Sequence, residues 1–208
     1  MANVLPTLHT TIQHLKEEFH LIPEARKTIL KQVGSYLQKK RNAQQTTLLN
    51  FICTHNSRRS HISQIWAQAA AYYYNVSDIR CFSGGTEATA FFPSAVKAMQ
   101  EAGFSITRVK QQANPVYEIR FADTADPIVV FSKKYDDPFN PANNFAAVMT
   151  CTHADENCPL VLGADTRISL PYDDPKAFDN TPLEAAKYTE RVHEIGRELL
   201  YAFSIINP

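Results

Sequence analysis

The sequence predicts an α/β fold: an open parallel sheet of four strands flanked by helices, with a helical hairpin at the N-terminus and an inserted β-hairpin. Two observations carry this prediction. Short runs of strand-forming apolar residues alternate with segments in which apolar residues recur every three or four positions. The chain has 208 residues, of which 44% are hydrophobic, so one domain can enclose a sizeable core. The alternation of strand and helix favours parallel pairing with right-handed crossovers.

The overall charge excludes several classes of partner. The 21 basic residues balance 21 acidic residues, so no global positive field attracts nucleic acid or an acidic membrane surface. The N-terminus lacks the charged-then-apolar pattern of a signal peptide, and no apolar run approaches the roughly 18 residues of a membrane span. Four cysteines are too few for a disulfide scaffold. We expect a cytoplasmic protein with no nucleic-acid or membrane partner, whose thiols are catalytic, redox-active or buried.

Residues 1–45 are predicted to form a helical hairpin appended to a main domain at residues 46–208. Such a pair of amphipathic helices either binds a partner or packs on its own domain, and the second outcome is the commoner one. The apolar positions recur at helical spacing, with Leu5, Leu8, Ile12, Leu15 and Phe19 in the first helix and Ile29, Val33 and Leu37 in the second.

The main domain begins with a predicted strand at residues 48–53, followed by a loop and a helical stripe. A second strand at residues 79–83 ends at Gly84 and Gly85, which permit a turn close to the first loop. The next helix, at residues 93–103, opens with a proline and closes with a glycine.

An insertion at residues 111–145 interrupts this alternation. It contains two short β-like runs, residues 116–121 and 128–132, separated by a polar turn, and we expect them to form a β-hairpin. Two further strands and a last helix follow: residues 145–150, residues 167–172, and a helix opened by a capping box at residues 181–184 with Pro182 at the first helical position.

The loop between the first strand and its helix carries the candidate active site. Backbone N–H groups of such a loop and the N-terminus of the following helix bind a tetrahedral oxyanion and favour the thiolate form of Cys53. Arg59 would grip the oxyanion with its planar guanidinium, and Ser60 would donate a hydroxyl proton to the sulfur. The alternative is a buried cysteine that closes a core strand, but the polar residues after it suit a buried strand end poorly. The predicted oxyanion-binding residues are Thr54, His55, Asn56, Ser57, Arg58, Arg59 and Ser60.

A second cysteine follows another predicted strand. Cys151 comes directly after residues 145–150, and the carboxyl ends of parallel strands meet at the edge where ligands bind. Cys158 lies seven residues further on, across a polar run. Cys81 alternates inward on the second strand, so we interpret it as structural.

Taken in order, these residues resemble the low-molecular-weight phosphatase fold, and within it the thioredoxin-coupled arsenate reductases. The resemblance covers residues 46–204 and leaves residues 111–145 as an insertion. It rests on the loop at residues 53–60, on residues 83–88 (Ser-Gly-Gly-Thr-Glu-Ala), on the pair Cys151 and Cys158, and on residues 173–175 (Asp-Asp-Pro).

The resemblance implies five catalytic residues. Cys53 is the nucleophile, Arg59 the oxyanion clamp, and Asp174 the general acid that protonates the leaving oxygen. Cys151 and Cys158 form a disulfide relay that a thioredoxin-like protein reduces. We expect no cofactor and no metal.

The sequence departs from the family pattern at several positions. His55 stands where the family usually has glycine, and Arg58, where it often has a second cysteine, is expected to add positive charge at the rim of the site. Gln64 stands where the reductases often have a glutamate associated with potassium, so that ion is not implied here.

A second aspartate could serve as the general acid in place of Asp174, and the residue after Pro175 is not aromatic. Asp137 also precedes a proline, but it lies in the insertion and before the second thiol, so it ranks behind Asp174. Phosphatases of this family usually follow the proline with a tyrosine that stacks on the substrate ring, whereas this chain has Lys176. A wall for a phenyl ring would have to come from elsewhere, with Tyr117 and Phe121 of the inserted hairpin as candidates.

Three functions fit these residues. The first is arsenate reduction, and the second is hydrolysis of phosphate monoesters, such as phosphotyrosine, through a phosphocysteine. Both use the loop and the acid, and the pair Cys151 and Cys158 favours the reductase because hydrolysis gives it no use. The third is a protein that captures an oxyanion or a metal without turnover, with Cys151, His153 and Cys158 as zinc ligands, although a fourth ligand is missing.

Overall fold

A parallel sheet of four strands, in the spatial order β2-β1-β6-β7, organises the molecule. The computed structural model describes residues 3–157 and 160–206. The strands are β1 (Thr47–Cys53), β2 (Ile79–Gly85), β6 (Phe145–Met149) and β7 (Ala164–Ser169), and every pairing between them is parallel. This confirms the predicted sheet. Strand β7 ends at Ser169, before the predicted residue 172, although the backbone N–H groups of Leu170 and Tyr172 still donate to the carbonyls of Met149 and Thr150.

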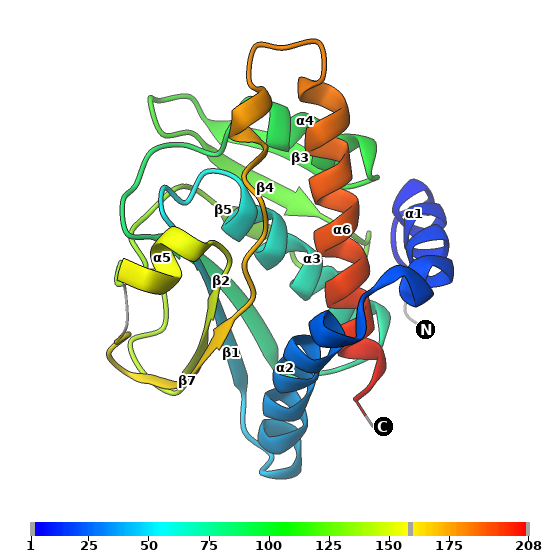
Figure 1. Ribbon diagram of the computed structural model, residues 1–208, viewed down its shortest axis with the longest axis vertical. Helices are drawn as coiled ribbons and strands as arrows, with labels where there is room; N and C mark the ends of the chain where they lie inside the picture. Colours follow the sequence, from blue (N-terminus) through cyan, green and yellow to red (C-terminus); the bar gives the residue numbers. More distant parts are fainter. Residues whose placement is uncertain (1–2, 158–159, 207–208) are drawn as a thin grey trace.

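Helices cover one face of this sheet (Figure 1). Helix α3 (Arg59–Tyr73) lies on β1 and β2, and α6 (Glu184–Ser204) crosses over α3 beside α4 (Pro93–Glu101). The close approach of α6 to α3 depends on Gly196, where an added Cβ would lie 2.6 Å from the ring of Trp66. Helix α6 begins at Glu184, later than predicted, although the side chain of Glu184 does accept a hydrogen bond from the backbone N–H of Asn180.

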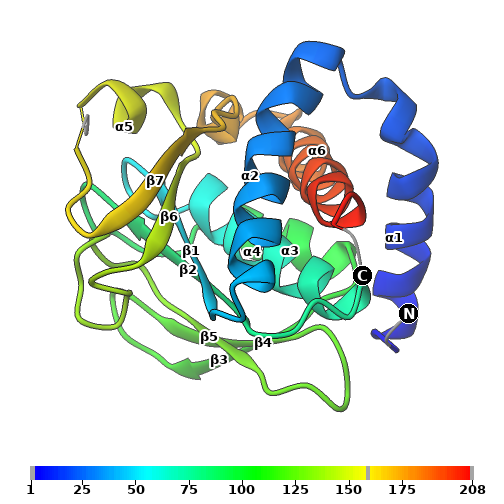
Figure 2. The same ribbon diagram turned by 90° about the horizontal axis from the view of Figure 1, so that it is seen from below.

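The N-terminal segment packs on its own domain. It consists of α1 (Pro6–Glu17), a 3₁₀ turn η1 (Glu18–Leu21) and α2 (Glu24–Asn42), and Figure 2 shows α1 and α2 on either side of α6. The two helices turn their apolar stripes into the main core, where Leu8, Ile12, Leu15, Leu30, Val33 and Leu37 are fully buried. The two N-terminal helices therefore pack on their own domain, which was the commoner of the two outcomes considered from the sequence.

The insertion forms a second, antiparallel sheet in the order β3-β4-β5. Strands β4 (Val116–Arg120) and β5 (Ile128–Val130) are the predicted hairpin. The sequence did not indicate the third strand, β3 (Ser105–Lys110), so the insertion begins earlier than residue 111. Most of β3 is exposed, which explains why it lacks the apolar alternation of a half-buried strand.

The carboxyl ends of β1 and β6 bring the candidate residues together. Helix α5 (Thr152–Asn157) follows β6 there and contacts β1, while a 3₁₀ turn η2 (Pro175–Phe178) lies between β7 and α6. A small second core, separate from the main one, includes Ile52, Phe145, Met149 and Cys151. In the part of the chain that the structure describes, no helix is both long and apolar enough to cross a membrane.

Candidate active site

The loop after β1 is held from outside by the end of β2. The backbone N–H of Thr86 donates to the carbonyl of Cys53 at 3.1 Å, and the N–H of Glu87 donates to the carbonyl of Thr54 at 2.8 Å. A Cβ at Gly85 would lie 2.6 Å from the backbone nitrogen of Asn56, so only glycine allows this approach. Gly85 therefore acts as the sequence predicted, by letting the second strand end against the first loop.

Hydrogen bonds fix the direction of the Ser60 proton. The backbone N–H of Lys133 donates to Oδ1 of Asn56 at 2.8 Å, so Nδ2 of Asn56 is the atom that faces Ser60 Oγ, 2.9 Å away. The Nδ2–H of Asn56 therefore donates to the oxygen of Ser60. The hydroxyl proton of Ser60 is left to donate to Cys53 Sγ, 3.0 Å away. Asn56 holds this position with a φ of 44°, which asparagine tolerates better than most residues. A thiolate at Cys53 thus has a buried hydroxyl donor beside it.

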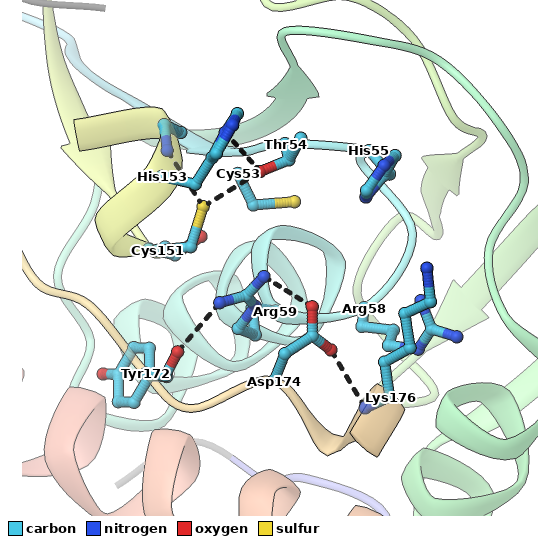
Figure 3. Close-up of polar contacts among 12 residues, drawn as sticks. Cys53, Thr54, His55, Arg58, Arg59, Cys151, His153, Tyr172, Asp174 and Lys176 are labelled. Carbon is cyan, nitrogen blue, oxygen red and sulfur yellow. Dashed lines mark hydrogen bonds and ion pairs between the residues drawn. The ribbon is translucent and has the colours of Figure 1, made fainter. Parts of the chain in front are cut away.

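Arg59 connects the loop to the candidate acid, as Figure 3 shows. Its Nη1 donates to the carbonyl of Tyr172 at 2.9 Å, and its Nη2 donates to Oδ2 of Asp174 at 2.6 Å. The other oxygen of Asp174 accepts the backbone N–H of Lys176 at 3.1 Å. Among the described residues, the buried Nε of Arg59 has no hydrogen-bond partner, so it remains a donor for a bound oxyanion.

Asp137, the other candidate for the general acid, lies away from Arg59. Oδ1 of Asp137 accepts the backbone N–H of Phe139 at 2.9 Å. The residue lines a separate cavity of about 280 Å³ together with Tyr135 and Phe145. Asp174, not Asp137, thus lies against the arginine of the loop.

A second thiol lies beside the loop. Cys151 is buried, and its Sγ is 3.5 Å from Oγ1 of Thr54, the residue that follows Cys53 (Figure 3). The backbone N–H of Ala154 points at the same sulfur from 3.4 Å, and Nδ1 of His153 lies 3.3 Å from the Thr54 hydroxyl. Cys158, the predicted third thiol, lies outside the described residues.

Other predicted loop residues take different environments. His55 is half exposed, with Nε2 3.8 Å from Glu87, and the carbonyl of Ser57 accepts the N–H of Phe92 at 2.9 Å. Arg58 does not add charge at the rim as expected, because its side chain is buried and paired with Asp179 at 2.6 Å.

The remaining candidates lie in the core. Cys81 is buried, and burial raises the pKa of its thiol, consistent with a structural cysteine. Tyr117 and Phe121 are each only 3% exposed, so neither can form the wall for a phenyl ring that the sequence suggested. Gln64 uses both ends of its amide on β2: Nε2 donates to the carbonyl of Cys81 at 3.0 Å, and Oε1 accepts the hydroxyl of Ser83 at 2.7 Å.

Sequence reasoning missed the supports of the site. Lys133 orients Asn56 through its backbone, while Asp179 and Tyr188 bind Arg58. These partners lie 77 to 130 residues away along the chain, and no local pattern marks them. Within residues 3–157 and 160–206, no group of three or more His, Cys, Asp or Glu side chains is arranged to hold a metal ion.

Comparisons with known proteins show the family to which the chain belongs. No family model matches the chain. It is 28% identical over 153 residues to an arsenate reductase of Bacillus subtilis, with 73% of this chain and 91% of that protein covered. It is 31% identical over 125 residues to an arsenate reductase of Brevibacillus brevis, with 60% and 74% covered.

A solved structure shows the same fold. It is a low-molecular-weight phosphotyrosine phosphatase from Vibrio cholerae, similar with a TM-score of 0.50 at 13% identity, with 74% of this chain and 93% of that chain covered. The sequence relatives and the shared fold agree with the family that the sequence resembles. The chain therefore belongs to the low-molecular-weight phosphatase fold family, together with these arsenate reductases.

Proposed function

We propose that the chain is a thiol-dependent arsenate reductase that works in the cytoplasm. The observation that carries the proposal is the position of Cys151, whose sulfur lies 3.5 Å from the hydroxyl of Thr54 in the loop that begins with Cys53. Hydrolysis of a phosphocysteine needs only water, so a second buried thiol at this point is explained by sulfur chemistry. The similarity to arsenate reductases supports the same choice.

In the first step, the backbone N–H groups of residues 54–60 and the guanidinium of Arg59 bind arsenate. The thiolate of Cys53, stabilised by the Ser60 hydroxyl at 3.0 Å, attacks arsenic and forms a sulfur–arsenic bond. The arsenic–oxygen bond to one hydroxyl breaks, and Asp174 gives that hydroxide a proton, so water leaves. Arsenic remains pentavalent at this stage.

In the second step, the sulfur of Cys151 attacks the sulfur of Cys53. The sulfur–arsenic bond breaks and its electron pair stays on arsenic, so arsenite leaves and the two thiols have lost two electrons to it. Cys158 then attacks Cys151, which frees Cys53 and leaves a Cys151–Cys158 disulfide. A thioredoxin-like dithiol protein reduces that disulfide and closes the cycle.

A phosphatase is the second candidate, because one observation favours it. Cys53, Arg59 and Asp174 form a complete set for phosphoryl transfer without any contribution from Cys151. In this reaction Cys53 becomes a phosphocysteine, and Asp174 serves as the base for the water that hydrolyses it.

Thiol mapping separates the two functions. The reduced protein is mixed with one equivalent of arsenate, without a reductant, and its thiols are labelled and located by mass spectrometry. We expect a Cys151–Cys158 disulfide, and we expect Cys158→Ser to stop at a Cys53–Cys151 disulfide. Cys81→Ala is the matched control, because that thiol is buried away from the loop. If arsenate leaves Cys151 and Cys158 free while an aryl phosphate is hydrolysed briskly, the protein is a phosphatase.

A further inference from the structure

The side chain of Arg58 forms a closed ring of hydrogen bonds with two residues far along the chain. Its Nη2 donates to Oδ2 of Asp179 at 2.6 Å, and its Nε donates to the hydroxyl oxygen of Tyr188 at 2.5 Å. The Tyr188 hydroxyl in turn donates to Oδ1 of Asp179 at 2.7 Å. Burial raises the pKa of Tyr188, which keeps its proton available for this bond. The side chains of Arg58 and Asp179 are only 9% and 16% exposed, so water competes little with these bonds.

An aromatic pair fixes the plane of the guanidinium. Cζ of Arg58 lies 3.9 Å from the ring centre of Phe92, and Phe92 stacks on Tyr188 with an angle of 18° between the ring planes. A planar guanidinium can stack on a ring while its edge bonds to a carboxylate, and an ammonium cannot reproduce this geometry.

The position of Arg58 in its own helix does not explain its presence. It is the N-cap of α3, where serine, threonine, aspartate and asparagine are preferred because they bond to the free N–H groups. The side chain makes no capping hydrogen bond within the described residues. The helix dipole also disfavours a cation at this end. Arg58 therefore departs from local preference, and such departures concentrate at functional sites.

Arg58 and Arg59 hold the two ends of one segment. We call residues 172–179, which carry Asp174, the acid segment. Arg59 bonds to Tyr172 and Asp174 at its beginning, and Arg58 bonds to Asp179 at its end. During turnover Arg59 has a second task, because its Nε, unpartnered among the described residues, serves the oxyanion while Nη1 and Nη2 hold the acid segment. The bond from Arg58 is not involved in oxyanion binding and can persist throughout.

We propose that Arg58 is a positioning residue that holds Asp174 over the oxyanion loop by fixing Asp179 at the far end of the acid segment. The proposal rests on the proposed function only in requiring that Asp174 act as the general acid. It predicts that Arg58 changes the rate of the step that Asp174 catalyses, with little effect on anion binding.

The test combines kinetics with a double-mutant cycle. Arg58→Met removes the guanidinium and keeps a long side chain. In single-turnover reactions with arsenate, we expect loss of the Cys53 thiol to slow by at least about tenfold. The dissociation constant of inorganic phosphate should change by less than about twofold, because the backbone donors of the loop remain. Arg197→Met is the matched control, because its ion pair with Glu18 joins α6 to the N-terminal segment instead.

The cycle distinguishes positioning from general damage. In an Asp174→Asn background, Arg58→Met should cause no further loss, whereas damage to the fold would lower the rate again. Asp179→Asn should reproduce the effect of Arg58→Met, and Arg58→Lys should fall between that variant and the wild type because it keeps a charge for Asp179. Should Arg58→Met fail to fold, Tyr188→Phe, which removes one oxygen, and Asp179→Asn carry the same cycle.

The two proposals fail separately. If arsenate does not oxidise the wild-type thiols, the reductase is excluded, and the cycle is run on hydrolysis of an aryl phosphate with a poor leaving group, since that route uses the same acid. Additive losses in the Asp174→Asn background, an unchanged rate, or a weaker affinity for phosphate with an unchanged rate would each overturn the role of Arg58. Absence of both reactions would overturn both proposals.

Discussion

Replacing Asp174 with asparagine isolates the proton transfer from the packing. Asparagine keeps a carbonyl oxygen that can accept the Arg59 N–H, which lies 2.6 Å from Oδ2 of Asp174, so the acid segment should stay in place. What is lost is the ion pair and the transferable proton. The Asp174 side chain is 30% exposed, so the ion pair contributes no more than about 1 kcal/mol. General acid catalysis contributes about 10²- to 10⁴-fold, or roughly 3 to 5 kcal/mol, so the proton dominates.

The dependence on the leaving group measures this proton directly. With an aryl phosphate whose leaving group is poor, Asp174→Asn should lower kcat/KM by about a hundredfold or more, and with a good leaving group by much less. Asp137→Asn is the matched control, because its carboxylate bonds to the backbone of Phe139 and lines another cavity. If Asp137→Asn shows the leaving-group dependence and Asp174→Asn does not, the acid comes from the insertion and our assignment is wrong.

Three further predictions concern the loop and the helix after it. Cys53→Ser should abolish both reactions yet bind phosphate in calorimetry, and wild-type turnover would contradict its role. Arg59→Lys should lose at least about tenfold in kcat/KM, some 1.4 kcal/mol, because an ammonium lacks the planar fork whose separate nitrogens reach Tyr172, Asp174 and the oxyanion, and normal kinetics would refute the clamp. Burial, and to a lesser extent the charge of Lys133, lowers the pKa of His61 to about 3. The unfolded chain therefore protonates this imidazole more readily than the folded protein does, and the free energy of unfolding falls as pH drops below about 6.5. From pH 7 to pH 5, the free energy of unfolding measured in urea should fall by about 2 kcal/mol less in His61→Asn than in the wild type. Equal decreases would mean that His61 is not buried as a neutral ring.

The sheet and the loop could be predicted because local patterns encode them. Strand β1 is an apolar run, and the polar loop after it ends where α3 begins, so sequence alone located residues 53–60 between a strand and a helix. The carboxyl ends of β1 and β6 then had to share one edge of a parallel sheet. The sequence therefore predicted Cys151 at the edge of the sheet that carries Cys53, and the structure adds the contact of its sulfur with Oγ1 of Thr54 at 3.5 Å.

The supports of the site could not be predicted, because they depend on partners distant in sequence. Arg58 looked like free positive charge, and only the fold shows that Asp179, 121 residues away, neutralises it. Strand β3 was missed because its residues are mostly exposed and leave no apolar alternation. Likewise, Asn56 is an ordinary loop residue until the backbone of Lys133 fixes which end of its amide faces Ser60.

The acid segment and helix α5 beside Cys151 are held with different strength, and the difference matches the proposed chemistry. The acid segment is bound by buried or partly buried groups from three helices and one helix cap. They are Arg58 at the N-cap of α3, Arg59 of α3, Tyr188 of α6, and Arg26 of α2, which lies 4.6 Å from the ring centre of Tyr172. Helix α5 beside Cys151 has six residues, too few to be stable alone, and its ion pair between Asp155 and Arg167 is partly exposed. Asp155 also accepts the hydroxyl of Ser169 at 2.5 Å, and because partly exposed ion pairs contribute about 1 kcal/mol or less, α5 is tied to β7 more weakly than the acid segment is tied to its helices. Attack on the oxyanion needs fixed groups, whereas handing a disulfide from Cys53 to Cys151 and onward needs a thiol that can move, and the weaker attachment of α5 suits that second need.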